Sequence, residues 1–158
     1  MSKKTLYIAY GSNINLEQMA FRCPTAKRFG TAILNNYELQ FKQVATIEPK
    51  ENSEVPVLLW ELSPNDEICL DKYEGYPSFY RKEYFEVEIK GGTFEAMVYV
   101  MNGNRPLMEP SDFYYNAIEK GYLANGLNTK YLEQALANSI LAQKCIPREY
   151  EGFQMKYE

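Results

Sequence analysis

Two β-prone runs, residues 79–90 and 93–101, flank Gly91-Gly92 and restrict the possible folds of this chain more than any other feature. A Gly-Gly pair supplies the positive φ angles that a two-residue hairpin turn requires. The alternation of residues along both runs then predicts one apolar face on the hairpin. The pairs expected on that face are Ile89 with Phe94, Val87 with Ala96, and Phe85 with Val98.

The opposite face of the hairpin carries charged residues and is predicted to face solvent: Lys82, Glu86, Glu88 and Glu95. If Phe85 points inward, Arg81 and Glu83 also point inward, at the open end of the hairpin. Charges rarely lie in an apolar core, so the pattern predicts a polar pocket at that end.

Before the hairpin, the sequence predicts a helix over residues 64–74. Ser63 is a capping residue, Pro64 suits the first helical position, and Asp66 completes a capping pattern three residues after the serine. Gly75 supplies a left-handed stop. The helix therefore places Glu74 in its last turn.

Near the N-terminus, residues 5–10 form a short β-prone run that breaks at Gly11-Ser12-Asn13, residues suited to turns. Asn13 or Asn15 is expected to cap a short helix over residues 16–22. Such a strand, turn and helix can direct backbone N–H groups toward an anion, although a turn that merely needs glycine explains the same residues.

Residues 26–34 and 37–42 are predicted strands joined by a tight turn at Asn35-Asn36. The polar segment 48–56 is expected to be a surface loop, and the apolar run 57–62 another strand.

After residue 101 helices dominate. Pro110-Ser111-Asp112 opens one whose buried face has helical spacing, Asn125-Gly126 ends it, and a second runs from Asn128-Thr129 to about Ala142. The face comprises Tyr114, Ala117, Ile118, Gly121 and Tyr122. Strands followed by helices indicate an α+β fold with one sheet or barrel.

The length of 158 residues suits a single domain over 1–158, with no placement predicted for the tail 146–158.

The three cysteines, Cys23, Cys69 and Cys145, are too scattered for a CxxC pair and are interpreted as buried thiols of a reducing compartment. Residues 1–15 lack a signal-peptide core, and no run approaches about 18 apolar residues, so a cytoplasmic location and no membrane partner are expected.

The chain has no histidine, which excludes Ser-His and Cys-His catalysis and the commonest zinc ligand. No metal site or organic cofactor is implied. The formal charge of −4 and the absence of a long basic run argue against a nucleic-acid partner. Chemistry must therefore use carboxylates, hydroxyls, lysine, backbone amides or the substrate itself.

Glu74 is the strongest candidate for that chemistry. A helix C-terminus disfavours a carboxylate and raises its pKa. Aromatic neighbours in the sequence are expected to exclude water from it: Tyr73, Tyr76, Phe79 and Tyr80. A carboxyl with a raised pKa beside a pocket suits acid/base catalysis, whereas most glutamates at such positions are simply solvated. Tyr114 is a further candidate, but its position on the buried face of its helix is also explained by a role in the core.

Three motifs in order resemble the γ-glutamylcyclotransferase family: Leu6-Tyr-Ile-Ala-Tyr-Gly-Ser-Asn13, Leu70-Asp-Lys-Tyr-Glu-Gly75, and Pro110-Ser-Asp-Phe-Tyr114 with Gly121 and Asn125-Gly126. The resemblance covers about residues 5–142 and implies a small mixed β-barrel flanked by helices.

By the same resemblance, the stretch from Tyr7 through Ile8, Ala9, Tyr10 and Gly11 to Ser12 binds substrate, with Asn13 beside it. Glu74 is then the proton acceptor and Tyr114 a substrate contact. Residues 76–81 also resemble relatives that act on other γ-glutamyl amines, so the resemblance does not identify the substrate.

The implied reaction explains the missing histidine, because the α-amine of a γ-glutamyl compound is its own nucleophile and closes to 5-oxoproline. Glu74 would move the protons, and the amides of Gly11, Ser12 and Asn13 would bind either the oxyanion or the α-carboxylate. Arg81 is a further candidate partner for a carboxylate. Two alternatives are a non-catalytic binding protein that uses the same pocket and a cyclotransferase that trims γ-glutamyl groups from a biosynthetic intermediate or a protein.

Overall fold

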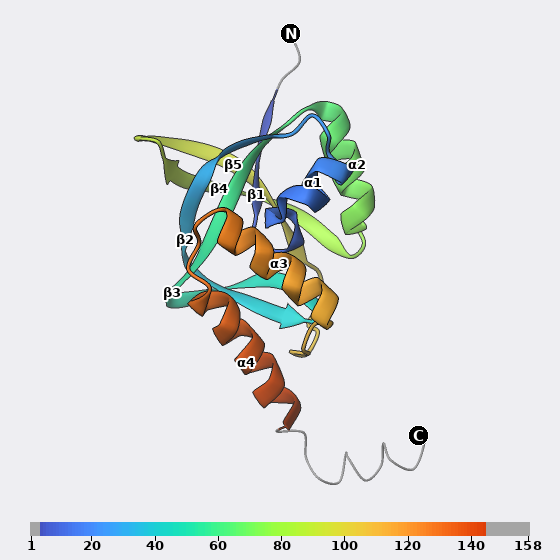
Figure 1. Cartoon of the computed structure of the whole chain (residues 1–158), viewed down its shortest axis with the longest axis vertical. Coiled ribbons are helices and arrows are strands. Elements are labelled where there is room, and N and C mark those ends of the chain that lie inside the picture. The colour runs from blue at the N-terminus through green and yellow to red at the C-terminus, as the bar shows by residue number, and fades with distance from the viewer. Residues whose placement is uncertain (1–3, 145–158) are drawn as a thin grey trace.

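The structure, a computed structural model, describes residues 4–144. Five strands, four α-helices and one short 3₁₀-helix follow one another along this part of the chain (Figure 1). In chain order they are β1 (Thr5–Ala9), η1 (Ser12–Ile14), α1 (Leu16–Arg22), β2 (Lys27–Lys42), β3 (Val44–Leu62), α2 (Pro64–Glu74), β4 (Tyr80–Ile89), β5 (Gly92–Met101), α3 (Asp112–Ala124) and α4 (Lys130–Lys144).

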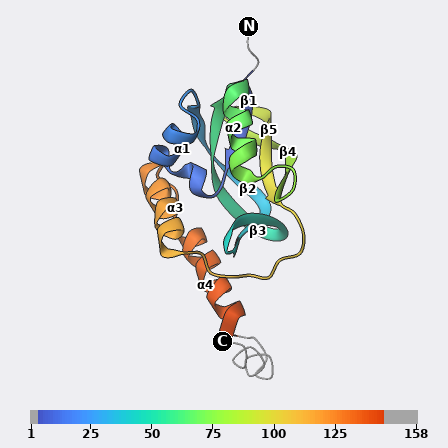
Figure 2. The ribbon, with the colours of Figure 1, turned by 90° about the vertical axis from the view of Figure 1, so that its right-hand side faces the viewer.

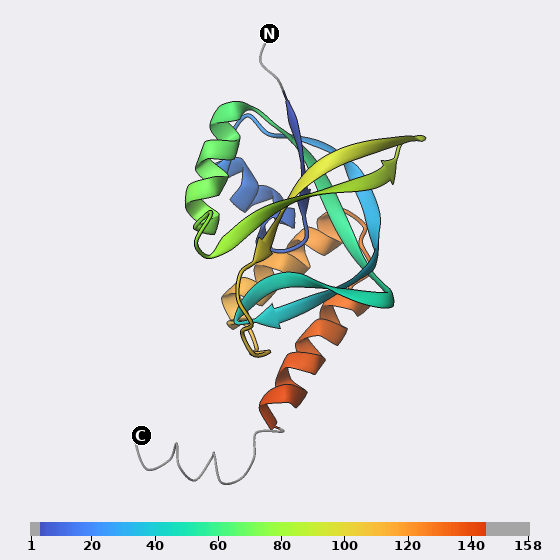
Figure 3. The ribbon, with the colours of Figure 1, turned by 180° about the vertical axis from the view of Figure 1, so that it is seen from behind.

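The strands form one mixed sheet in the order β2-β3-β1-β5-β4. The short central strand β1 runs antiparallel to β3 and parallel to β5. The outer strands β2 and β4 approach each other. Tyr37 of β2 stacks on Phe85 of β4 with ring centroids 4.9 Å apart. The sheet therefore curls into a partly closed barrel, with the helices outside it (Figures 1 and 3). This confirms the predicted α+β class.

The β4–β5 hairpin forms as expected, but its register differs by two residues from the prediction. Ile89 pairs with Gly92, and Lys90 and Gly91 are the turn residues, with φ angles of 55° and 73°. Val87 consequently lies opposite Phe94. Because side chains alternate with a period of two, this shift does not move residues to the other face, and near the turn Val87 and Ile89 are buried as predicted.

The prediction that Arg81 and Glu83 point inward is wrong. Their side chains are 48% and 36% exposed and form an ion pair with each other. At the open end of the hairpin the covered face of β4 is the opposite one, where Tyr80 donates a hydrogen bond to the carbonyl of Ala45. Lys82 was predicted to face solvent, but its side chain is 12% exposed and binds the carboxylates of α2.

The predicted turn at Asn35-Asn36 is also wrong, since β2 continues through it and reverses only at Gln43, whose φ is 76°. Asn36 does have a left-handed φ of 65°, but it forms a bulge rather than a turn. The register moves there from Asn35–Glu54 to Tyr37–Pro49, and all of the predicted surface loop 48–56 belongs to β3. Sequence alone does not separate a bulge from a turn, because both use an asparagine with positive φ.

The helices match the predicted boundaries closely. Asn15 caps α1 by accepting a hydrogen bond from the backbone N–H of Gln18, and Ser63 and Asp66 form the expected capping box on α2. α3 lies directly against η1 (Figure 2). Gly121 permits this contact, since a Cβ there would be 2.6 Å from the backbone carbon of Ile14.

The cysteines are only partly as expected. Cys23 is buried, but Cys69 is exposed on α2. Cys145 and the tail 146–158 lie outside the described residues. Among the helices of residues 4–144, none has the length and apolar composition needed to cross a membrane.

Candidate active site

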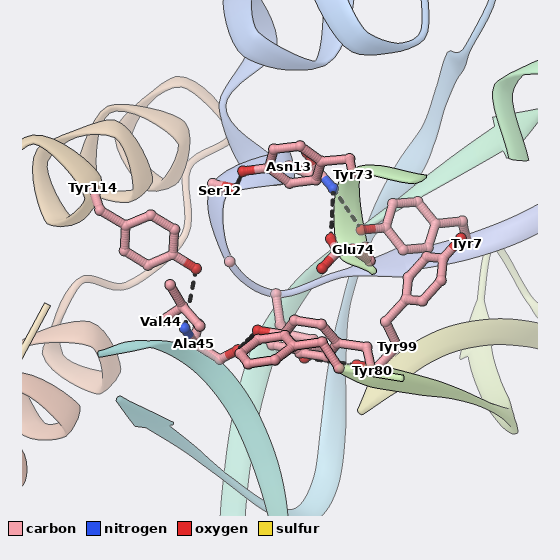
Figure 4. Close-up of a pocket in the computed structure, with 13 residues that line it drawn as sticks. Tyr7, Ser12, Asn13, Val44, Ala45, Tyr73, Glu74, Tyr80, Tyr99 and Tyr114 are labelled. Carbon is pink, nitrogen blue, oxygen red and sulfur yellow. Dashed lines mark hydrogen bonds between the residues drawn. The ribbon is translucent and has the colours of Figure 1, made fainter. Parts of the chain in front are cut away.

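A cavity of about 140 Å³ opens where the segment after β1, the last turn of α2 and the start of β3 meet (Figure 4). Thirteen residues line it: Tyr7, Tyr10, Gly11, Ser12, Asn13, Val44, Ala45, Tyr73, Glu74, Phe79, Tyr80, Tyr99 and Tyr114. The structure thus brings Glu74 and the Tyr10–Asn13 segment, far apart in the sequence, to the same cavity.

The Tyr10–Asn13 segment is held rigidly between the sheet and α3. A Cβ on Gly11 would lie 3.2 Å from the Cβ of Ala45 and 3.4 Å from the hydroxyl of Tyr114, so this position favours glycine. Trp60 donates a hydrogen bond from Nε1 to the backbone carbonyl of Asn13 at 2.9 Å. The N–H groups of Ser12 and Asn13 are in the first turn of η1, where amides lack acceptors within the helix, and can bind an anion.

Glu74 lies at the end of α2, where Gly75 adopts the expected left-handed conformation with φ of 67°. Its Oε1 accepts a hydrogen bond of 3.4 Å from Nδ2 of Asn13, which also donates to the hydroxyl of Tyr7 at 2.9 Å. Removal of water by the surrounding side chains raises the pKa of Glu74 to about 7, while Arg22 opposes this shift. Desolvation is the largest cause of the shift, whereas the sequence argument also relied on the helix dipole.

Tyrosine hydroxyls make up much of the polar wall. Tyr10 donates to the carbonyl of Tyr99 at 2.6 Å, Tyr80 to the carbonyl of Ala45 at 2.7 Å, and Tyr114 accepts from the N–H of Ala45 at 3.0 Å. Burial raises the pKa values of these hydroxyls above the ordinary range. They therefore stay neutral near pH 7, and Glu74 is the lining carboxyl that titrates there.

Not every residue predicted for the site reaches the cavity. Ile8 and Ala9 are fully buried in β1 and only support the wall. Arg81 lies elsewhere, with Nε 2.7 Å from Oε2 of Glu83 and Nη1 donating to the carbonyl of Met101. Tyr7 and Tyr114 do line the cavity.

Sequence reasoning missed four residues near the site. Val44 and Ala45 line the cavity from β3, Tyr99 lines it from β5, and Arg22 contacts Asn13 from behind. Nothing in the local sequence identifies the first three, because tertiary folding alone brings these strands to the cavity. Arg22 was detectable only as a basic residue at the end of the helix that follows the Gly11–Asn13 turn.

Within residues 4–144, no lysine or arginine lines the cavity, and no group of three acidic or thiol side chains converges on a point where it could hold a metal ion. What the lining offers is one carboxyl that exchanges a proton near neutral pH, backbone N–H groups beside it, and neutral hydroxyls. Such a site suits proton transfer on a small polar molecule.

Comparison with known proteins agrees with this description. Residues 7–119 match the family model described as gamma-glutamyl cyclotransferase, AIG2-like. The chain is 31% identical to human gamma-glutamylcyclotransferase, covering 93% of this chain and 81% of the relative, and 29% identical to the bovine protein over the same shares. A solved structure named gamma-glutamyl cyclotransferase superposes with a TM-score of 0.75 at 29% identity, covering 84% of this chain and 86% of the other.

Proposed function

This chain belongs to the gamma-glutamyl cyclotransferase, AIG2-like family, and we propose that it converts a γ-glutamyl amide or γ-glutamyl amino acid to 5-oxoproline and a free amine, with Glu74 as acid and base. The observation that carries the catalytic role is the position of the Glu74 carboxyl. It lies in the same cavity as the Gly11–Asn13 amides, with a pKa of about 7.

The proposed reaction needs no nucleophile from the protein. Glu74 accepts a proton from the α-ammonium of the substrate, and the free amine attacks the γ-carbonyl carbon. A C–N bond forms and closes a five-membered ring, and the carbonyl oxygen becomes an oxyanion. When the oxyanion collapses, the bond to the leaving nitrogen breaks and Glu74 gives its proton to that nitrogen. Glu74 then takes the second proton that the ring nitrogen loses and passes it to the released amine, which leaves as an ammonium ion. Because both reacting groups are in one molecule, holding it folded supplies a large effective molarity.

The rest of the cavity supports this chemistry. A cavity of about 150 Å³ holds a molecule the size of benzene. The observed volume of about 140 Å³ therefore suits the γ-glutamyl group, with the leaving amine directed toward the opening. The amides of Gly11, Ser12 and Asn13 supply donors for the α-carboxylate or the oxyanion, and Tyr7 and Tyr114 supply polar contacts.

A non-catalytic binding protein is the less favoured alternative. An ionised Glu74 would repel the α-carboxylate of a ligand in so small a cavity, which makes its position costly unless it reacts. The named relatives also favour the enzyme. The sequence-based expectation of a cytoplasmic location stays a prediction.

The test is incubation with a panel of γ-glutamyl amides and γ-glutamyl amino acids, with 5-oxoproline measured by mass spectrometry. In ¹⁸O-labelled water we expect unlabelled 5-oxoproline, because no water oxygen enters the ring. N-acetylation of the α-amine should abolish the reaction, while the blocked compound still competes with substrate. Labelled free glutamate as the first product would indicate hydrolysis instead, and no turnover of any compound would favour the binding protein.

A further inference from the structure

Arg22, the last residue of α1, connects the two segments that carry the proposed chemistry without lining the cavity. Its Nη1 donates to Oδ1 of Asn13 at 2.6 Å and to Oγ of Ser12 at 3.3 Å. Its guanidinium carbon lies 3.7 Å from the centre of the Tyr73 ring, in the last turn of α2. One side chain therefore contacts both the Gly11–Asn13 turn and the residue next to Glu74.

This contact decides the orientation of the Asn13 amide. Arginine has donors but no acceptor, so the group that faces Arg22 must be the oxygen of Asn13. The NH₂ group then points to the other side, toward Oε1 of Glu74 and the hydroxyl of Tyr7 (Figure 4). A flipped amide would place NH₂ against the guanidinium and oxygen against the carboxyl, two repulsive contacts.

We propose that Arg22 is a positioning residue for the reaction: by its hydrogen bond to Asn13 it holds the amide NH₂ group against Glu74 and so keeps the reactive carboxyl directed into the cavity. We call this Arg22–Asn13–Glu74 connection the relay. The kinetic part of this inference rests on the function proposed above, whereas the geometric part does not.

The relay also has an electrostatic component. Arg22 is the cation near Glu74, and its charge lowers the pKa of a carboxyl that burial raises. The other titratable groups that line the cavity with Glu74 are tyrosines. Tyr73 precedes Glu74 on α2. Burial raises the pKa values of the other five, which are Tyr7 and Tyr10 from the β1 end, Tyr80 from β4, Tyr99 from β5 and Tyr114 from α3. These five are neutral near pH 7, so the NMR titration is read at the Glu74 carboxyl itself.

The first test removes the charge without requiring turnover. The carboxyl of Glu74 is followed by ¹³C NMR in protein labelled at glutamate Cδ, with the signal assigned from Glu74→Gln. We expect a midpoint near pH 7 in the wild type, a higher midpoint in Arg22→Gln, and one near the wild type in Arg22→Lys. Equal midpoints in wild type and Arg22→Gln would overturn the relay, even if the chain proves inactive.

The second test asks whether Arg22 acts through Asn13. Misplacement of a catalytic group by about 1 Å can cost about 10²-fold in rate. We therefore expect Arg22→Lys and Asn13→Ala to lower kcat by up to about 10²-fold for the γ-glutamyl compound of the panel that the wild type converts fastest, with smaller changes in KM. The double variant should be no slower than Asn13→Ala, because residues that act in one chain are not additive. Losses that multiply would contradict the relay.

A matched control is Arg28→Gln, which removes an arginine whose Nη1 donates to the side chain of Asn125 at 3.3 Å on the exposed surface. It should leave both the titration of Glu74 and kcat unchanged.

Thermal melting is measured for every variant. If Arg22→Gln fails to fold, the kcat comparison with Arg22→Lys still decides the proposal. A wild type inactive on every γ-glutamyl compound contradicts the proposed function and not the geometry.

Discussion

In two regions of the chain an arginine lies near a glutamate, but the glutamate is open to solvent in one region and desolvated in the other. On the hairpin, Arg81 and Glu83 form a direct ion pair of 2.7 Å, but both side chains are open to solvent. Beside the cavity, the contact between Arg22 and Glu74 passes through Asn13, yet the pKa of Glu74 rises to about 7. The pKa of Glu74 rises although a positive charge is near, because removal of water from the carboxyl outweighs the attraction of Arg22.

This difference shows why the sequence analysis proposed Arg81 for the site and did not consider Arg22. Arg81 follows Glu74 closely in the chain and was expected in the pocket, whereas Arg22 is remote in sequence. Solvent screening leaves exposed pairs such as Arg81–Glu83 with little energetic effect. The partly buried network of Arg22, Asn13 and Glu74 has larger effects, since water screens its charges less.

The largest expected difference between the regions is catalytic. Glu74→Gln removes the proton carrier and should lower kcat by about 10²–10⁴-fold, the usual contribution of general acid and base catalysis. Glu83→Gln makes the same change in the exposed pair and should leave kcat unchanged. Steady-state formation of 5-oxoproline measures both. Full activity of Glu74→Gln would remove Glu74 from the mechanism.

Asn13→Asp should convert the relay into a repulsive contact. The new carboxylate still binds Arg22 but replaces the NH₂ donor that faces Glu74, so it should raise the pKa of Glu74 further. Activity at pH 7 should fall roughly 10-fold, as expected when less of the base is ionised, and recover partly as pH increases. A pH profile of kcat/KM that matches the wild type would show that Asn13 does not influence Glu74.

The stability of the protein should depend on pH through Glu74. The pKa of Glu74 is raised from 4.5 to about 7 in the folded state. The stabilising contribution of the protonated form is therefore complete below about pH 4.5 and is lost as pH rises through about 7. Glu74→Gln should melt at a higher temperature than the wild type above pH 7 and at a similar temperature near pH 4. The same melting difference at every pH would contradict the assignment.

The smallest effect is expected for Arg81→Gln. Exposed ion pairs contribute about 0–1 kcal/mol, so denaturant unfolding should change by no more than this amount. Because Arg81 lies outside the cavity, the KM for a γ-glutamyl substrate should not change. An increase in KM without loss of stability would restore the carboxylate-binding role that the sequence suggested.

Much of the local structure was predictable because its causes are local. The capping box of Ser63 and Asp66 and the stop at Gly75 specify α2 with little reference to the rest of the chain, and they place Glu74 in its last turn. Asn15 caps α1 by the same kind of short-range hydrogen bond. The faces of the β4–β5 hairpin near its turn were also predictable, although its register was not, because a two-residue shift leaves the pattern of faces unchanged. At the open end the prediction was wrong, because α2 covers the face that carries Lys82.

By itself, the sequence determined the class of fold, the position of Glu74 on its helix, and a chemistry without histidine. Only the tertiary structure decided which side chains surround that carboxyl. Ala45, Tyr99 and Arg22 reach the site through the curvature of the sheet and the packing of α1, which depend on contacts between segments distant in the chain. The raised pKa has the same origin, since desolvation depends on everything that excludes water from a group, and no local pattern of residues encodes it.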